Sequence, residues 1–227
     1  MNKKANKIVT AEIIKARENG TLGEVLPSGT SVKTTLGNKE AVFDVARDSR
    51  KTYLVMHNVM RRTEQMNWKQ TNDGGWYASD LRAYVSKLFK ELPAEVRELA
   101  IPVRNRQVCR DKICHGDDWL GVVESDDLAF ILSSSQVFGG NRPEDCGDEQ
   151  LDIFTDPVNR IKYMEFMDGG EPVAWWWWLR SAINTAESYS CAASYDFGLV
   201  DADGVSGYTY SNSFGGVVIA ICIEDRS

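Results

Sequence analysis

The chain has 227 residues, a formal net charge of −7 and a composition of 43% apolar and 26% charged residues. This length and balance predict one globular domain with a substantial core and argue against a disordered chain. The acidic surplus argues against broad nucleic-acid binding, which requires excess Lys and Arg to neutralise phosphates. The basic residues of 97–112 are therefore interpreted as an ordinary solvated face.

The N-terminal segment, residues 1–21, predicts a short helix ahead of the main domain, residues 22–227. Apolar residues recur at helical spacing over 8–19 and stop at Gly20, a suitable C-terminal cap. We expect this helix either to pack on the body or to serve for attachment or homo-oligomerisation. No apolar run is long enough for a signal peptide or approaches the roughly 20 residues of a membrane span, so neither is expected.

Residues 22–138 predict short strands and then helices. Alternating apolar runs at 41–48 and 52–60 are typical of strands. The segment 79–92 predicts an amphipathic helix capped by Ser79, and Pro93 is expected at the start of a second helix. A buried strand is predicted at 128–132.

The remainder predicts an irregular region followed by strands. Residues 139–172 are rich in Gly, Asp and Pro, with one helix expected around 157–166. Strand-like runs follow at 193–201, 205–213 and 215–224, and the Asp203-Gly204 pair predicts a hairpin turn between the first two. Early helices and later strands together predict the α+β class.

No metal, cofactor or catalytic residue is predicted. The odd number of cysteines favours free thiols, and Cys109, Cys114, His115 and Cys146 lack the paired spacing of zinc ligands. The acidic groups lack the rhythm of a calcium loop and are interpreted as solvated loop residues, with calcium and zinc as alternatives. These groups are Asp117, Asp118, Asp126, Asp127, Asp145, Asp148 and Asp152.

Only two histidines are present, and the familiar nucleophile, phosphate and metal motifs are absent from the sequence. His57 lies within a predicted strand and is interpreted as a half-buried structural residue. We therefore expect a protein that is not an enzyme.

Four consecutive tryptophans predict a rigid scaffold. Residues of a strand alternate between its faces, so a strand of tryptophans must be covered on both faces and lie centrally in its sheet. The predicted scaffold is Trp175, Trp176, Trp177, Trp178, Leu179 and Arg180.

The following segment, 182–214, has the composition of a binding surface. It is dominated by Ser, Ala, Tyr, Asp, Gly and Asn, and combinations of Tyr with Ser, Gly and Asn are typical of binding loops. A β-rich tail with ordinary strand and turn residues is the alternative. The candidate ligand-binding residues are Ile183, Asn184, Ser188, Tyr189, Ser190, Ser194, Tyr195, Phe197, Tyr208, Tyr210 and Asn212.

Several motifs resemble one known family. "WWWWLRSA" is followed by a serine- and asparagine-rich run, a "DADG" hairpin and a "GGV" strand, with "FDVARD", "GGWYASDLRAYVSKLF" and "LAFILSSSQVFG" in order upstream. Over about residues 40–223 the chain is similar to the C-type-lectin-like domains of gut bacteria and their phages, which include variable proteins diversified by retroelements.

The resemblance implies a fold of two short helices and small twisted sheets, with C-terminal strands and loops that bind a protein or glycan ligand. It also implies diversification directed at adenines, through codons that cannot encode Lys, Glu, Gln, Met or Trp. Of these types, residues 182–214 contain only Glu187, which should therefore be an unvaried position. On this interpretation the protein is cytoplasmic or part of a virion.

One departure from the family pattern concerns the last strand, where Val218 and Ile219 replace its usual Arg and Pro. Arg180 must therefore be satisfied differently. Two alternatives stay open: a structural or surface protein of the same fold, and an enzyme related to formylglycine-generating oxidases. The enzyme would need reactive thiols, and Cys191 and Cys222 are the cysteines near the predicted site.

Overall fold

The structure is a computed structural model that describes residues 11–110, 120–140, 142, 145–165, 170–182 and 196–225. The helices are α1 (Ala11–Glu18), α2 (Leu22–Val25), α3 (Gly75–Ala78), α4 (Asp80–Glu91), α5 (Ala94–Leu99) and α7 (Ser134–Phe138), with 3-10 turns η2 (Asp152–Thr155) and η3 (Pro157–Arg160). None of the helices in these ranges is long and apolar enough to cross a membrane.

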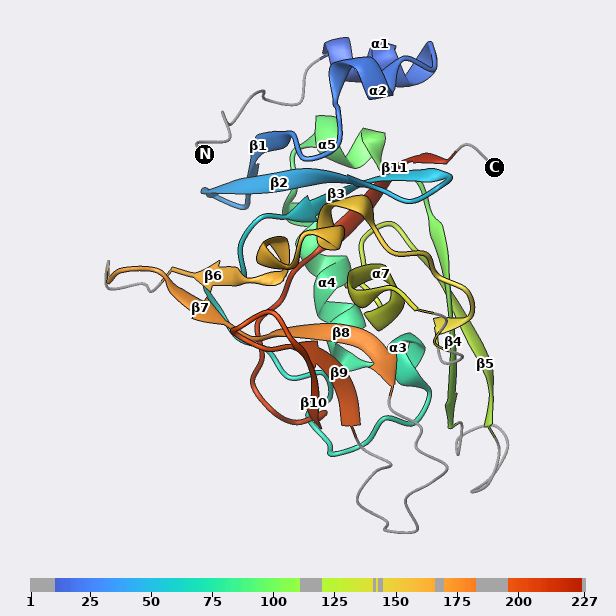
Figure 1. The fold of residues 1–227 in the computed structure, drawn as a ribbon, viewed down its shortest axis with the longest axis vertical. Helices are drawn as coiled ribbons and strands as arrows, with labels where there is room; N and C mark the ends of the chain where they lie inside the picture. The colour runs from blue at the N-terminus through green and yellow to red at the C-terminus, as the bar shows by residue number, and fades with distance from the viewer. Residues whose placement is uncertain are drawn as a thin grey trace.

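The strands form four small antiparallel sheets (Figure 1). The first has the order β1-β2-β3-β11 and the second β10-β9-β8, while β4-β5 and β6-β7 are two-stranded ribbons. Their bounds are β1 (Ser31–Leu36), β2 (Lys39–Arg47), β3 (Lys51–Met56), β4 (Val103–Arg110), β5 (Leu120–Asp127), β6 (Lys162–Met164), β7 (Val173–Trp175), β8 (Trp177–Ala182), β9 (Asp196–Val200), β10 (Ser206–Tyr210) and β11 (Ala220–Asp225). Small sheets and short helices confirm the α+β class.

The N-terminal helix α1 packs on the body of the molecule. Ile13 and Ala16 are buried in the common core. Arg17 Nη1 donates to the carbonyl oxygens of Glu98 and Leu99 at 3.1 and 2.9 Å, which ties α1 to the C-terminal end of α5. Cationic groups at this end of a helix satisfy carbonyls that have no partner within the helix.

Helix α4 confirms the clearest sequence prediction. The Ser79 hydroxyl accepts a hydrogen bond from Arg82 N at 3.1 Å, which caps the first turn. The apolar face of the helix buries Leu81, Val85 and Leu88 in the core. Helix α5 then begins at Ala94, directly after Pro93, as predicted.

Two predicted elements were wrong. The helix expected around 157–166 is only the 3-10 turn η3, followed at once by β6. The strand expected at 128–132 is irregular: Leu128 is exposed, and Phe130 makes a single bridge to Ala220. The backbone of this segment lies between β11 and β8 and bonds to each of them. The apolar run therefore indicated a buried segment correctly, but the segment forms no regular strand pairing.

The tryptophan run is divided between two strands. Trp175 ends β7, whereas Trp177 and Trp178 begin β8 and are fully buried. The sequence predicted a central strand here, and this was wrong. Strand β8 is the last strand of its sheet. Its outer edge is nevertheless covered, because Trp178 N donates to Gly216 O and Arg180 N donates to Leu132 O.

Two glycines allow the chain to approach the tryptophans closely. A Cβ atom on Gly215 would lie 2.3 Å from the Trp176 ring, and one on Gly216 would lie 2.7 Å from the Trp176 carbonyl oxygen. Real Cβ atoms are not found so close to other heavy atoms, so the two glycines of the "GGV" element are required for this segment to pack against the tryptophan run.

We expect Trp177→Ala to lower the free energy of unfolding by about 3–5 kcal/mol, because it removes a fully buried ring. The matched control is Trp68→Ala, which removes a ring that is 68% exposed and should change stability by less than about 0.5 kcal/mol. Chemical denaturation measures both. Equal destabilisation would contradict the assignment of Trp177 to the scaffold.

Candidate functional site

The β9–β10 hairpin presents the exposed aromatic residues of the C-terminal sheet. Val200 pairs with Ser206, and Gly204 closes the turn with φ of 84°, as the Asp203-Gly204 pair predicted. Along β10, exposed residues alternate with half-buried ones. Tyr208 and Tyr210 therefore point to the same face and are 68% and 48% exposed.

A second segment, the loop of residues 64–71, lies against the end of this hairpin. Asn67 N donates to Ser211 O at 2.9 Å, and the Ser211 hydroxyl accepts from Thr71 N at 2.9 Å. Between these contacts lies Trp68, whose exposed ring has Lys69 Nζ 4.9 Å from its centroid. The loop that packs against the end of the hairpin therefore carries an exposed tryptophan of its own.

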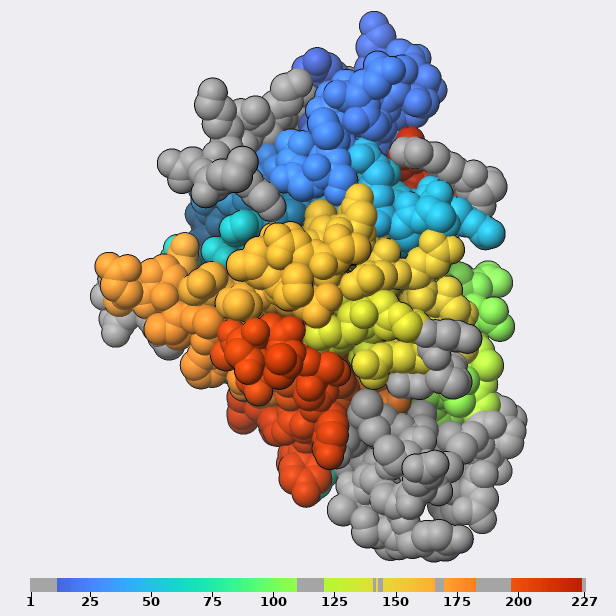
Figure 2. All heavy atoms as spheres, viewed as in Figure 1, coloured from blue at the N-terminus to red at the C-terminus, as the bar shows by residue number. Residues whose placement is uncertain are grey.

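We call the exposed aromatic residues of the hairpin, of the chain just after it and of the loop the β10 surface. It consists of Trp68, Tyr208, Tyr210 and Phe214. Phe214 follows the hairpin and precedes Gly215, which pairs with Glu64 of the loop. Figure 2 shows the C-terminal hairpin, in orange-red, at the surface of the molecule.

Sequence reasoning placed Phe197 on the ligand-binding face, and this was wrong. Phe197 lies in β9, between β8 and β10, and is fully buried. Asn212 is half-buried. Seven of the predicted ligand-binding residues lie outside the described residues: Ile183, Asn184, Ser188, Tyr189, Ser190, Ser194 and Tyr195.

Sequence reasoning also missed Trp68 and left Phe214 out of the predicted site. Trp68 lies in a polar loop far from the C-terminal segment, and its contact with the hairpin depends on the tertiary hydrogen bonds of Ser211. A lone tryptophan among polar residues was the available signal. Exposed aromatic residues on a rigid frame are the usual anchors of a binding surface.

The frame beneath this surface is held by a buried charge. Arg180, in β8, is 1% exposed and forms an ion pair with Asp148. Its Nη1 atom also donates to Gln136 Oε1 at 2.7 Å and to Ile131 O at 3.3 Å. The last strand has Val218 and Ile219 in place of the family's usual Arg and Pro, and both are buried apolar residues. Arg180 instead finds its partners in α7 and in the segments that flank this helix.

A second carboxylate joins the same elements. Asp145 accepts hydrogen bonds from Ser135 N, at 2.7 Å, and from the Ser181 hydroxyl. The Ser181 hydroxyl accepts from Ser134 N at 2.8 Å. Helix α7 is thereby fastened to β8 through side chains, and Gln136 and Ser133 complete a capping box at its start.

Burial raises the pKa of Asp148 above its ordinary value, while the positive charge of Arg180 acts in the opposite direction. The charge of Arg180 therefore opposes the effect of burial on the pKa of this carboxyl group without outweighing it. Because the guanidinium is buried, the pair contributes little net stability, but the loss of Asp148 would leave an uncompensated buried charge.

Two of the acidic residues differ from the prediction of solvated loop residues, whereas Asp126 and Asp152 are exposed as predicted. Asp127 and Asp145 are buried, and Asp127 accepts hydrogen bonds from Trp76 Nε1, Asn105 Nδ2, Ser125 Oγ and Arg82 Nε. Both carboxylates accept hydrogen bonds from other residues of the chain, because a charge that is removed from water requires polar partners. Asp117 and Asp118 lie outside the described residues.

The described ranges contain no cluster of three or more His, Cys, Asp or Glu side chains arranged for a metal ion. Cys109 is buried and Cys146 is half-buried, whereas Cys114 and His115 lie outside those ranges. On the β4-β5 ribbon, Arg104 and Arg106 form exposed ion pairs with Asp126 and Glu124.

We expect Asp148→Leu to cost about 3–5 kcal/mol of unfolding free energy, because it leaves the Arg180 guanidinium, which is only 1% exposed, without its ionic partner. The double substitution Arg180→Leu/Asp148→Leu should recover a large part of this loss. The control Arg104→Leu breaks an exposed pair and should cost less than about 1 kcal/mol. Denaturant unfolding tests this, and additive losses in the double variant would contradict it.

Comparisons with known proteins give one match. No curated protein and no solved structure matches the chain. A domain family of unknown function, DUF6273, matches residues 49–224, which contain the tryptophan run, the hairpin and the last strand. The chain therefore belongs to the DUF6273 family.

Proposed function

We propose that this protein binds a protein or glycan ligand through the β10 surface, on a C-type-lectin-like fold whose C-terminal face is diversified by a retroelement. One observation carries the proposal: Tyr208 and Tyr210 are exposed at alternate positions of β10, directly beside strand β9, whose residues 197–200 are buried. Large amphipathic rings on a fixed backbone provide contact area at a low entropic cost.

The structural roles of the motifs support the C-type-lectin-like assignment. The "WLRS" element supplies the buried strand β8, "DADG" forms the hairpin turn and "GGV" provides the close approach to the tryptophans. Each motif acts in the frame beneath the C-terminal face, and none supplies the face itself. A family with a variable ligand surface requires such a separation between fixed motifs in the frame and variable residues on the exposed face.

Diversification is supported by the same division. Ser206, Tyr208 and Tyr210 have their side chains in solvent, so replacement there leaves the packed interior unchanged. The enzyme alternative gains no such support from Cys222. Burial raises the pKa of its thiol to about 12, which opposes the thiolate that redox catalysis needs. Cys191 lies outside the described residues.

Binding is tested with Tyr208→Ala/Tyr210→Ala against wild type on protein and glycan arrays. We expect wild type to bind a restricted set of ligands and the double variant to lose at least about 100-fold in affinity, because two aromatic anchors are removed. Tyr163→Ala is the matched control, since Tyr163 is an exposed tyrosine on β6, outside this surface. No wild-type binding, or binding that survives the double substitution, would contradict the proposal.

Diversification is tested at the gene. We expect a near-copy of codons 181–215 close to the gene, with differences confined to adenine positions, beside a reverse-transcriptase gene. Sequencing of the locus in several isolates should show variation at codons 206, 208 and 210 and none at codons 177–180. A locus without the copy would refute diversification and leave the binding proposal to be judged on the arrays.

A further inference from the structure

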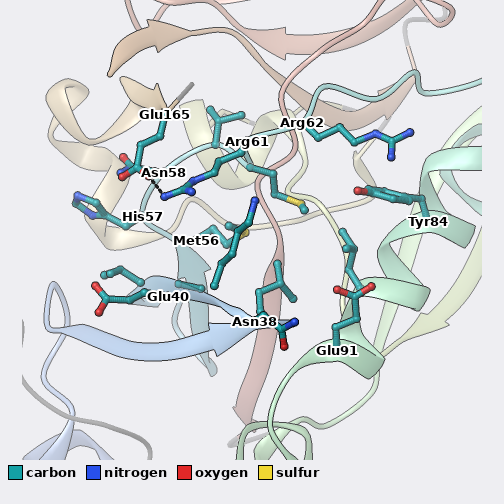
Figure 3. A pocket seen from close by; sticks show the side chains of 18 residues that line it. Asn38, Glu40, Met56, His57, Asn58, Arg61, Arg62, Tyr84, Glu91 and Glu165 are labelled. Atoms are coloured by element: carbon teal, nitrogen blue, oxygen red, sulfur yellow. Dashed lines mark hydrogen bonds and ion pairs between the residues drawn. The ribbon is translucent and has the colours of Figure 1, made fainter. Parts of the chain in front are cut away.

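A pocket of about 790 Å³ lies away from the β10 surface (Figure 3). Its walls come from the β1–β2 hairpin, the segment after β3, helix α4 and Glu165 after β6. Pockets of this volume are typical of small-molecule sites. None of the four residues of the β10 surface lines it.

One polar group of the pocket has a fixed orientation. His57 Nδ1 lies 2.8 Å from Asp44 Oδ2, and the other Asp44 oxygen accepts from the Ser31 hydroxyl at 2.8 Å. Burial acts to raise the pKa of Asp44, but the hydrogen bond from His57 and the positive charge of Lys162 outweigh it and lower the pKa below its ordinary value. Asp44 is therefore a carboxylate, which only accepts, so His57 carries its proton on Nδ1.

This arrangement leaves His57 Nε2 for a ligand. The His57 side chain is 47% exposed and lines the pocket, in contrast to the half-buried structural role that its sequence position suggested. Lys162 Nζ donates to the carbonyl oxygens of Met56 and His57, which fixes the backbone beneath the ring. In its neutral form, an imidazole held in this way presents Nε2 as a directed acceptor to an N–H or O–H group.

The inner wall of the pocket is apolar. Met56, Val59 and Leu88 are buried residues that line it, and Met60 and Tyr84 are partly buried beside them. Methionine side chains adapt their shape to apolar ligands of different outline. The wall therefore suits a ligand with aliphatic or aromatic side chains.

Charges of both signs surround this wall. Arg61 pairs with the neighbouring Glu165, as the dashed line in Figure 3 marks. Glu40 pairs with Lys33, which does not line the pocket. Arg62 pairs with Glu64, which is not a lining residue. These pairs already neutralise most of the charged side chains of the pocket.

Two charged side chains that line the pocket differ from the others in their ion pairing. The Lys39 ammonium and the Glu91 carboxylate form no ion pair within the described part of the chain. Both lie near the β1–β2 turn, where Gly37 N donates to Glu91 O at 3.1 Å. In Figure 3 the Glu91 side chain extends from α4 toward the interior of the pocket.

We propose that this pocket binds a short zwitterionic peptide with apolar side chains, with its ammonium on Glu91, its carboxylate on Lys39 and a main-chain N–H donated to His57 Nε2. Opposite unpaired charges favour a ligand that carries both signs over a simple anion or cation. The site is a second one, independent of the β10 surface.

Calorimetry with the full chain tests the site, with Leu-Leu, Met-Met and Val-Tyr as probes at neutral pH. We expect saturable binding of one peptide per chain for at least one probe. Lys39→Gln and Glu91→Gln should each weaken that binding at least about tenfold, because each removes a charge-assisted contact. Lys87→Gln and Glu95→Gln, which change exposed charges outside the pocket, should leave it unchanged.

Modified probes separate the two ends of the peptide. Glu91→Gln should have no effect on the N-acetylated probe, and Lys39→Gln should have none on the C-terminal amide. The Tyr208→Ala/Tyr210→Ala variant should bind the free peptide as wild type does, so failure here is distinct from failure at the β10 surface. Absence of saturable binding for all three probes, or binding indifferent to both pocket substitutions, would overturn the proposal.

Discussion

The ion pair between Arg180 and Asp148 is the constraint on which the C-terminal half of the fold depends. A buried guanidinium must be fully satisfied, and here its partners come from the start of α7 and from the segments on either side of it. The charge therefore requires these irregular segments to lie against β8. Such a pair contributes more to the choice of one arrangement than to net stability. Asp145 strengthens the same junction through Ser135 and Ser181.

Packing of the last segment against the start of β8, along the same outer edge, completes the frame. Trp176 and Trp178 meet edge-to-face at 5.0 Å between ring centroids, and Gly215 and Gly216 allow the last segment to reach them. Trp178 Nε1 donates to Glu64 O at 2.8 Å, so the ring also anchors the loop that carries Trp68. The tryptophan run thus joins the hairpin and the loop through one rigid element. The exposed rings of the β10 surface make no comparable contribution to the core.

Sequence patterns predicted the elements whose signals are local. The 3.6-residue periodicity of α4 and the turn chemistry of Asp203-Gly204 depend on neighbouring residues alone, and both were confirmed. The misplaced elements depend on tertiary contacts, since the apolar run at 128–132 is buried by other strands without joining a regular sheet. The prediction for Phe197 was wrong for a related reason. Composition can indicate that a segment forms a binding surface, but the order of the strands determines which of its side chains are buried. Trp68 and the burial of Asp127 likewise depend on partners distant in sequence.

The central claim is that residues of the β10 surface can be substituted freely, whereas residues of the buried frame beneath it cannot. A proteolytic-stability scan of all substitutions across residues 196–216 tests it most directly. The account predicts tolerance at Ser206, Tyr208, Tyr210 and Phe214, whose side chains are exposed. It predicts intolerance at the buried or closely packed residues, which are Phe197, Val200, Ser211, Gly215 and Gly216. Sensitivity spread evenly over both groups would contradict the division between frame and face.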